Sequence, residues 1–117
     1  HLNYMSDLLK KKCAPCEGGV IPFNISEIHK YQKKVDGWSL NENEKIFFLE
    51  KDFKFKNFVE SQDFVNEVGK ISEEEGHHPD IIFGWGYAQI KITTHAIKGL
   101  SENDFILAAK IDKILNV

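Results

Sequence analysis

The sequence predicts an α+β domain, a four-stranded antiparallel sheet with three helices packed on one face. The 117 residues contain three segments whose apolar residues recur at helical spacing. Between these segments lie two pairs of short β-prone runs, and a turn joins the runs of each pair. The resulting order is helix, hairpin, long helix, hairpin, helix. Two amphipathic hairpins can bury their apolar sides by forming one sheet that the helices cover.

The composition indicates one domain with a proper core, because 42% of the residues are apolar and nine are Phe. No apolar run is long enough to cross a bilayer, and no signal-peptide pattern is present. Two cysteines without an export signal indicate a reducing, cytoplasmic setting. All 15 basic residues are Lys and the net charge is -3, which argues against direct binding of nucleic acid, where Arg is favoured.

The domain organisation starts with residues 1–4, which we interpret as a remnant of an expression tag. Residues 5–25 form an N-terminal arm whose Pro and Gly residues argue against regular structure. Residues 26–117 form the single folded domain. Within the arm, Cys13 and Cys16 could be half of a zinc site or a redox pair, but a zinc site usually needs a second pair and no further Cys exists. A simple covering arm is the alternative.

The first helix is predicted to begin at a Ser26 cap and to end at residues 36–37. The first hairpin follows, with strands over residues 38–40 and 45–53 and a turn over 41–43. Its second strand is apolar on both sides, which fits a central strand or a face sealed by another subunit. We expect Phe47 and Leu49, or their neighbours, on the face that the helices leave open. Such a face predicts a homodimer or homotetramer.

The long helix is predicted over residues 54–75, and its end carries three glutamates, residues 73–75. Carboxylates there oppose the helix dipole. Either the three glutamates are simply a solvated charged run, or one of them supplies a carboxylate that acts beside the histidines that follow. The apolar stripe of this helix, read as core, is Phe55, Phe58, Val59, Val65, Val68 and Ile71, with Phe64 flanking it.

The second hairpin is predicted over residues 80–85 and 87–94. Strand alternation puts Ile90 and Ile92 on one face, and His95 leaves the strand on the opposite, polar side. The last helix starts with a capping-box-like pattern from Ser101 to Asp104. Its buried stripe is predicted to be Leu107, Ala108, Ile111, Ile114 and Leu115.

Three of the five histidines fall near this hairpin, at His77, His78 and His95. Gly76 and Pro79 stop the helix around the first two, so both can project from an irregular corner into one cleft. A metal site is one interpretation, but adjacent histidines rarely ligate the same ion. Proton transfer near neutral pH is the other, since the unperturbed imidazole pKa is about 6.5. Histidines that merely cap a loop remain the plain alternative.

A combined motif resembles the signature of the pterin-4a-carbinolamine dehydratases. Its parts are Glu73-x-x-x-His77-His78-Pro79, Trp85, Thr94-His95 and a trailing segment from Gly99 to Asp104. The resemblance extends back through Gly37-Trp38 and covers residues 26–115. One departure is Gly76, which stands where animal members carry Asp, so that Glu73 or Glu75 would have to supply the carboxylate.

The resemblance implies a dehydratase that removes water from 4a-hydroxytetrahydropterin to give quinonoid dihydropterin, without metal or organic cofactor. This lyase step recycles tetrahydrobiopterin for aromatic amino acid hydroxylases. By the motif, His77 and His95 act as acid and base, and His78 acts with them or orients the substrate. Glu73, His78, Trp85 and Asp104 are the implied substrate-binding residues, although Asp104 could instead cap the helix.

Two other functions are compatible with the sequence. Animal relatives also act as a dimerisation cofactor for a homeodomain transcription factor, so the scaffold could be a non-catalytic binding module. A zinc-dependent site that uses Cys13, Cys16 and a histidine is the third hypothesis.

Overall fold

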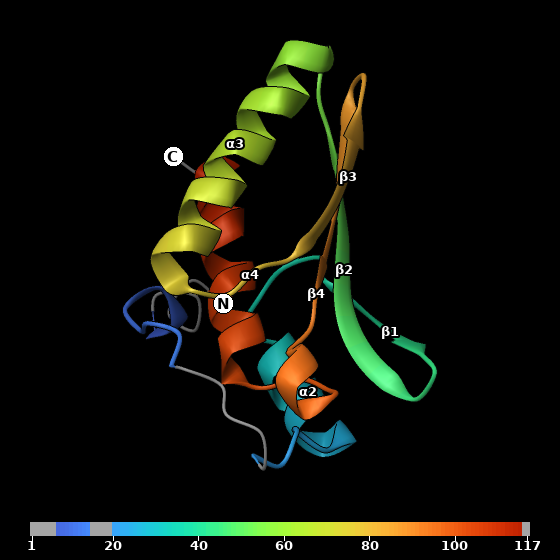
Figure 1. The fold of residues 1–117 in the computed structure, drawn as a ribbon, viewed down its shortest axis with the longest axis vertical. Helices are drawn as coiled ribbons and strands as arrows, with labels where there is room; N and C mark the ends of the chain where they lie inside the picture. Colours follow the sequence, from blue (N-terminus) through green and yellow to red (C-terminus); the bar gives the residue numbers. More distant parts are fainter. Residues whose placement is uncertain (1–6, 15–19, 116–117) are drawn as a thin grey trace.

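The computed structural model describes residues 7–14 and 20–115, so the predicted tag remnant at residues 1–4 and Cys16 lie outside the described residues. One four-stranded sheet has the order β1-β2-β4-β3, and all neighbouring strands are antiparallel. Helices α3 and α4 lie on the same side of this sheet (Figure 1). The predicted α+β fold class is confirmed. The elements are α2 (Ile25–Gln32), β1 (Ser39–Asn43), β2 (Ile46–Lys54), α3 (Phe58–Glu75), β3 (Asp80–Gly84), β4 (Tyr87–Ile92), η1 (His95–Ile97) and α4 (Glu102–Leu115).

The covered face of the sheet follows from strand alternation in its two central strands, β2 and β4. Leu49 pairs with Ile92 and both are buried, while Phe47 packs against the same core. The expectation that Phe47 and Leu49 lie on the open face is therefore wrong. The alternative, that their neighbours form the open face, fits the structure. Side chains alternate along a strand, so Ile46 and Phe48 point to the open side. Whether a second copy of the chain covers that side remains a prediction.

Helix α3 begins at Phe58, four residues later than predicted, because β2 continues to Lys54. The side chain of Asn57 caps it by accepting a hydrogen bond from the Glu60 amide at 2.9 Å. Phe58 and Val59 are exposed, so the predicted stripe is wrong at its first turn. The residues that α3 does bury are Ser61, Phe64, Val68 and Ser72.

The first helix and hairpin also differ from prediction at their ends. Asn24 caps α2, with Glu27 completing a reciprocal capping box, so Ser26 lies inside the helix. The β1–β2 turn centres on Glu44 and Lys45, which both have positive φ, rather than on residues 41–43. Two consecutive residues of this kind are what a tight two-residue hairpin requires.

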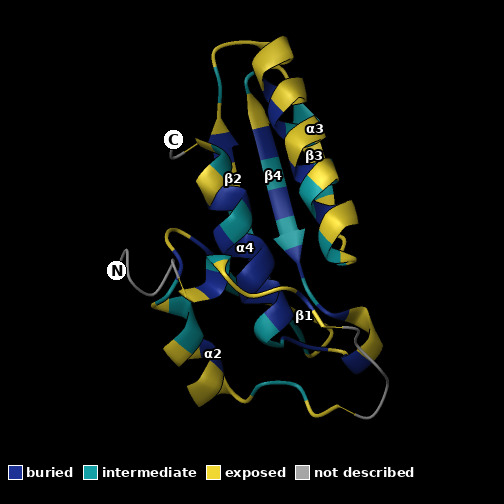
Figure 2. Ribbon diagram, turned by 90° about the vertical axis from the view of Figure 1, so that its left-hand side faces the viewer, coloured by how far each residue is buried: buried dark blue, intermediate teal, exposed yellow. Residues whose placement is uncertain are grey.

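Helix α4 is buried almost all round, which is more than the predicted single stripe (Figure 2). Helices α3 and α2 both contact it, and its buried apolar residues belong to the same core cluster as Leu49, Ile90 and Ile92 of the sheet. Leu115, at its end, is exposed, contrary to prediction. The buried Asp112 accepts hydrogen bonds from Lys51 Nζ at 2.8 Å and from the Trp38 indole at 3.0 Å, so its charge is paired.

Arm residues Leu8 and Cys13 are part of the buried core. Cys13 donates its thiol to the Asn103 carbonyl at 3.5 Å. Among the described residues, no helix is both long and apolar enough to span a membrane.

Candidate functional site

The histidine corner is built by the way α3 ends. Gly76 takes the left-handed conformation, with φ of 64°, and the His77 amide donates to the Ser72 carbonyl at 3.1 Å. This is the usual way for a helix to satisfy its last carbonyls, and glycine adopts it without strain. Pro79 then leads directly into β3. The backbone of His77 is therefore a fixed extension of α3.

His77 lies against a buried carboxylate at the start of α4. Its Nε2 is 2.7 Å from Oδ1 of Asp104, and the two side chains are 11% and 0% exposed. An ionised carboxylate can only accept hydrogen bonds, so Nε2 carries the proton of the neutral ring. Nδ1 is then the ring nitrogen that can accept a proton from a substrate.

The second oxygen of Asp104 links the corner to the segment that carries His95. Oδ2 accepts from Thr94 Oγ1 at 2.7 Å and from the Ser101 amide at 2.8 Å. Asp104 thus holds His77 on one oxygen and the neighbour of His95 on the other. The β3–β4 register agrees with this arrangement, because Asp80 pairs with Lys91 and both histidine segments lie beyond that pair at the same end of the hairpin.

A cavity of about 240 Å³ opens beside His95 on the uncovered side of the sheet. His95 is exposed, as predicted, at the first position of η1. Neither His77 nor His78 lines this cavity, although Asp80, which follows them, does. The cavity lining consists of Asn43, Glu44, Ile46, Phe48, Asp80, Lys91, Thr93 and His95.

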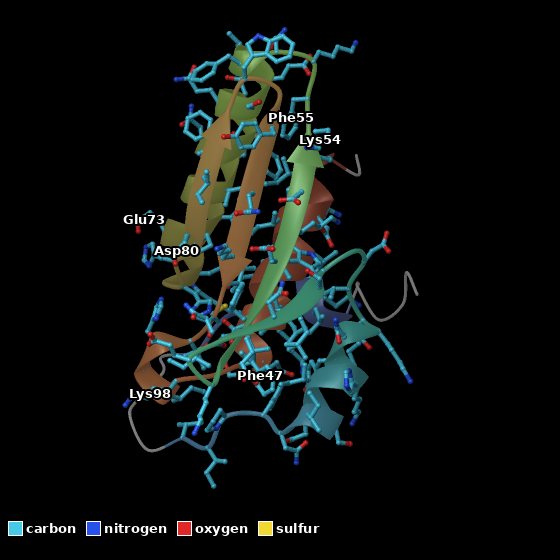
Figure 3. The ribbon with its side chains drawn as sticks, turned by 90° about the vertical axis from the view of Figure 1, so that its right-hand side faces the viewer. Phe47, Lys54, Phe55, Glu73, Asp80 and Lys98 are labelled. Carbon is cyan, nitrogen blue, oxygen red and sulfur yellow. The ribbon has the colours of Figure 1, made fainter. Side chains whose placement is uncertain are left out.

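His78 lies in a different environment from its neighbour. It hydrogen-bonds the carboxylate of Glu73 one turn back on α3, and the two side chains are 61% and 77% exposed. Figure 3 shows Glu73, Asp80 and Lys98 along one edge of the molecule, contributed by α3, β3 and the end of η1. The exposed pair therefore lies on the edge that also carries the cavity residue Asp80.

Glu75 contacts none of the histidines among the described residues. One of its carboxylate oxygens accepts the Cys13 amide at 2.9 Å and the other accepts Lys110 Nζ at 2.6 Å. Burial alone would raise the pKa of Glu75, but these hydrogen bonds outweigh it, so the pKa lies below its ordinary value. Of the two glutamates expected to compensate for Gly76, Glu73 is the one that contacts a histidine in the described part of the chain.

Trp85 lies away from the other predicted site residues. It occupies the turn between β3 and β4 and is 70% exposed. Six residues separate it from Pro79, which along a strand corresponds to about 20 Å. Within one copy of the chain, the structure does not bring Trp85 to the histidines.

Two polar partners of Asp104, Thr94 and Ser101, entered the sequence analysis only as members of the motif and of the capping-box-like pattern, without a role in the site. The capping-box-like pattern predicts one of these contacts, between the side chain of Asp104 and the amide of Ser101, and the structure has it at 2.8 Å. Nothing local predicts that Asp104 also reaches His77. Among the described residues, no group of three or more His, Cys, Asp or Glu side chains is placed to hold a metal ion.

The chain is similar to known proteins over most of its length. The family model described as pterin 4 alpha carbinolamine dehydratase matches residues 22–114. A relative from Rubrobacter xylanophilus is 46% identical over 110 residues, which cover 94% of this chain and 100% of the relative. One from Rickettsia canadensis is 48% identical over 109 residues, covering 92% of this chain and 97% of the relative. Both carry the name pterin-4-alpha-carbinolamine dehydratase as a provisional assignment.

Two solved structures share the fold. A protein from Brucella melitensis, described as a transcriptional coactivator/pterin dehydratase, has a TM-score of 0.71 and 25% identity, covering 80% of this chain and 97% of that one. A pterin dehydratase-like protein described as a RuBisCO assembly factor in the alpha-carboxysome has a TM-score of 0.58 and 26% identity, covering 67% and 88%.

Proposed function

The chain belongs to the pterin-4a-carbinolamine dehydratase family, and on that premise we propose that it dehydrates 4a-hydroxytetrahydropterin to quinonoid dihydropterin by histidine acid/base catalysis. The single observation that carries the proposal is the buried Asp104 carboxylate. It fixes His77 with one oxygen and, with the other, anchors the segment that presents His95 to a cavity.

The size of the cavity favours a small substrate. Its volume of about 240 Å³ is below the roughly 300–1,000 Å³ of sites for drug-sized ligands. Its lining mixes the aromatic Phe48 with charged and polar groups such as Asp80 and Lys91. A flat bicyclic ring with several hydrogen-bonding edges matches such a surface.

The reaction needs one proton acceptor and one proton donor. In our proposal, the substrate lies in the cavity beside His95 and extends past its rim to the histidine corner. There Nδ1 of His77, which does not line the cavity, takes the proton from N5 as the C4a–N5 double bond forms. Protonated His95 gives its proton to the 4a-oxygen, the C4a–O bond breaks, and water leaves. After this step His77 is protonated and His95 is neutral. Because His95 is exposed to solvent, water can carry a proton from His77 back to His95 and restore the starting state.

Asp104 suits His77 to the acceptor role. A carboxylate on the far nitrogen selects the tautomer with Nδ1 unprotonated and stabilises the imidazolium that forms when Nδ1 takes a proton. Because Asp104 is fully buried, we assign it this positioning role in place of the substrate contact expected from the sequence. His78 and Glu73 remain proposed to bind or orient the substrate at the exposed edge of the site.

The direct test is turnover of synthetic 4a-hydroxytetrahydropterin by the purified chain, followed by the absorbance of the quinonoid product against the uncatalysed rate. Added chelator should leave the rate unchanged. A rate no higher than the uncatalysed one at micromolar protein would refute the proposal.

A non-catalytic binding module is the second candidate. The observation that favours it is that the two structural neighbours are described as a transcriptional coactivator and as a RuBisCO assembly factor. Capture of a protein partner, together with absent turnover, would support this candidate over the enzyme.

We expect the enzyme to act in the cytoplasm, as a homodimer or homotetramer, in recycling the pterin used by aromatic amino acid hydroxylases. Light scattering on the purified chain tests the oligomeric state.

A further inference from the structure

Residues 11–14 of the N-terminal arm, which we call the strap, lie against the two helix ends that build the site. In Figure 1 the blue N-terminal segment passes beside the yellow C-terminal end of α3. The Cys13 amide donates to Glu75 at 2.9 Å. The Ala14 amide donates to Asn103 Oδ1 at 3.0 Å, and Asn103 Nδ2 donates to the Ala14 carbonyl at 2.7 Å.

These contacts fall directly beside the catalytic groups. Glu75 is two residues before His77, and Asn103 is the residue before Asp104. The same two helix ends are thus joined twice, once by the His77–Asp104 hydrogen bond and once by the strap. Lys110 on α4 adds a third link by donating to the second oxygen of Glu75.

The contacts between the strap and the two helix ends involve buried residues, so the strap can hold the helix ends in a fixed relative position. Cys13 and Asn103 are both buried, so hydrogen bonds there are shielded from competing water. Burial, with Glu75 nearby, raises the pKa of the Cys13 thiol to about 12. The thiol is therefore neutral at physiological pH and packs as a small apolar group that donates weakly to the Asn103 carbonyl.

We propose that Glu75 and Asn103 are positioning residues for the dehydration, which act through the strap to keep His77 in register with Asp104. The inference rests on the proposed function for its kinetic readout. Since the backbone of His77 is fixed to α3 by Gly76 and Ser72, any shift of the α3 end relative to α4 changes the His77–Asp104 contact. Small misplacements of catalytic groups lower turnover strongly.

The test uses the full chain with Glu75→Met and Asn103→Leu, which keep side-chain size and remove the hydrogen bonds to the strap. Glu75→Met also removes the ion pair with Lys110, whereas Asn103→Leu leaves that pair in place. We expect kcat to fall about 10-fold with KM within about twofold of wild type, as for loss of an alignment made in the transition state. In ¹⁵N-labelled protein, the Nε2–H proton of His77, identified by its absence in His77→Gln, should broaden or disappear in both variants.

Two controls separate positioning from plain stability. Glu74→Met changes the exposed neighbour of Glu75 and should leave both readouts at wild type. Ile111→Val trims the core face of α4 and should lower the melting temperature while leaving kcat and the imidazole proton unchanged.

The proposal is overturned if either readout is unchanged in Glu75→Met and Asn103→Leu. Should Asn103→Leu fail to fold, Glu75→Met decides alone. The imidazole proton can be followed without substrate, so absent turnover in the wild type would refute the proposed function and leave the strap to be judged by that signal.

Discussion

The two ends of the β3–β4 hairpin differ in burial and in the polar contacts of their side chains. At the site end, His77 contacts a carboxylate with no exposure to solvent, and three donors meet that carboxylate. At the opposite end, which we call the tip, Trp85 is exposed in the turn, and the partly exposed Tyr87 follows it. The motif that unites Trp85 with the histidines along the sequence therefore spans two places about 20 Å apart in one chain.

This difference teaches which motif members can act together. Proton transfer needs groups within hydrogen-bonding reach of one reacting centre. Only the site end brings titratable side chains together with buried partners, whereas the tip presents apolar surface. If function follows this division, substitutions at the site end lower turnover and a substitution at the tip does not.

The largest effect is expected at the site end, from His77→Ala and His95→Ala. Each variant removes one proton-transfer group, and the loss of such a group typically costs 10²–10⁴-fold. We expect kcat for loss of 4a-hydroxytetrahydropterin to fall by about 10²-fold or more in each. Near-wild-type turnover in both would remove the site end from the mechanism.

Asp104→Asn should come next, with turnover reduced about 10-fold or more. If the amide oxygen serves Thr94 and Ser101, the amide nitrogen faces His77 and forces the tautomer whose Nδ1 is protonated and cannot accept. Asp112→Asn is the matched control, because it alters the other buried carboxylate of α4, which pairs with Lys51 and Trp38. It should lower the melting temperature without changing kcat, and equal kcat losses in both would contradict the assigned role of Asp104.

The acid stability of the site end should depend on Glu75. Its pKa is lowered in the folded chain, so its ionised form stabilises the fold above its unfolded pKa of about 4.3. This contribution is lost as pH falls through the lowered folded value. Urea unfolding of Glu75→Gln should therefore show a flatter loss of stability than wild type from about pH 5 downward. Parallel curves for the two proteins would contradict this expectation.

The smallest effect is expected at the tip, from Trp85→Ser. An exposed turn residue usually changes stability by no more than about 0.5 kcal/mol. We expect kcat and KM to stay within about twofold of wild type, measured at the same protein concentration. A large rise in KM would break the comparison, and would mean that the tip of a second copy reaches the site.

Much of the fold could be predicted because it is written in local periodicity. The alternation from Gln89 to Ile92 predicted that Ile90 and Ile92 share one face, and both are buried. The order and type of the main elements were predicted for the same reason. Element ends were less predictable, since the cap that starts α3 is Asn57, inside a segment whose apolar spacing continues from β2 without a break.

The buried face of α3 was predicted only in part, for a tertiary reason. Apolar spacing offered Phe58 and Val59 as core, yet the buried line of α3 runs through Ser61 and Phe64. Small serines let the helix approach its neighbours, and they satisfy their hydroxyls on the carbonyls of Asn57 and Val68 one turn earlier. Hydrophobicity alone ranks Phe above Ser and so misplaces the first turn of the buried face.

By itself, the sequence determined where the chain must stop, turn and alternate, because Gly76, Pro79 and the polar side of β4 act on their own neighbours. Only the tertiary structure decided that Asp104 meets His77, 27 residues away, and that the strap meets Glu75. Such contacts depend on how whole elements pack, and no local period encodes the distance between two helix ends.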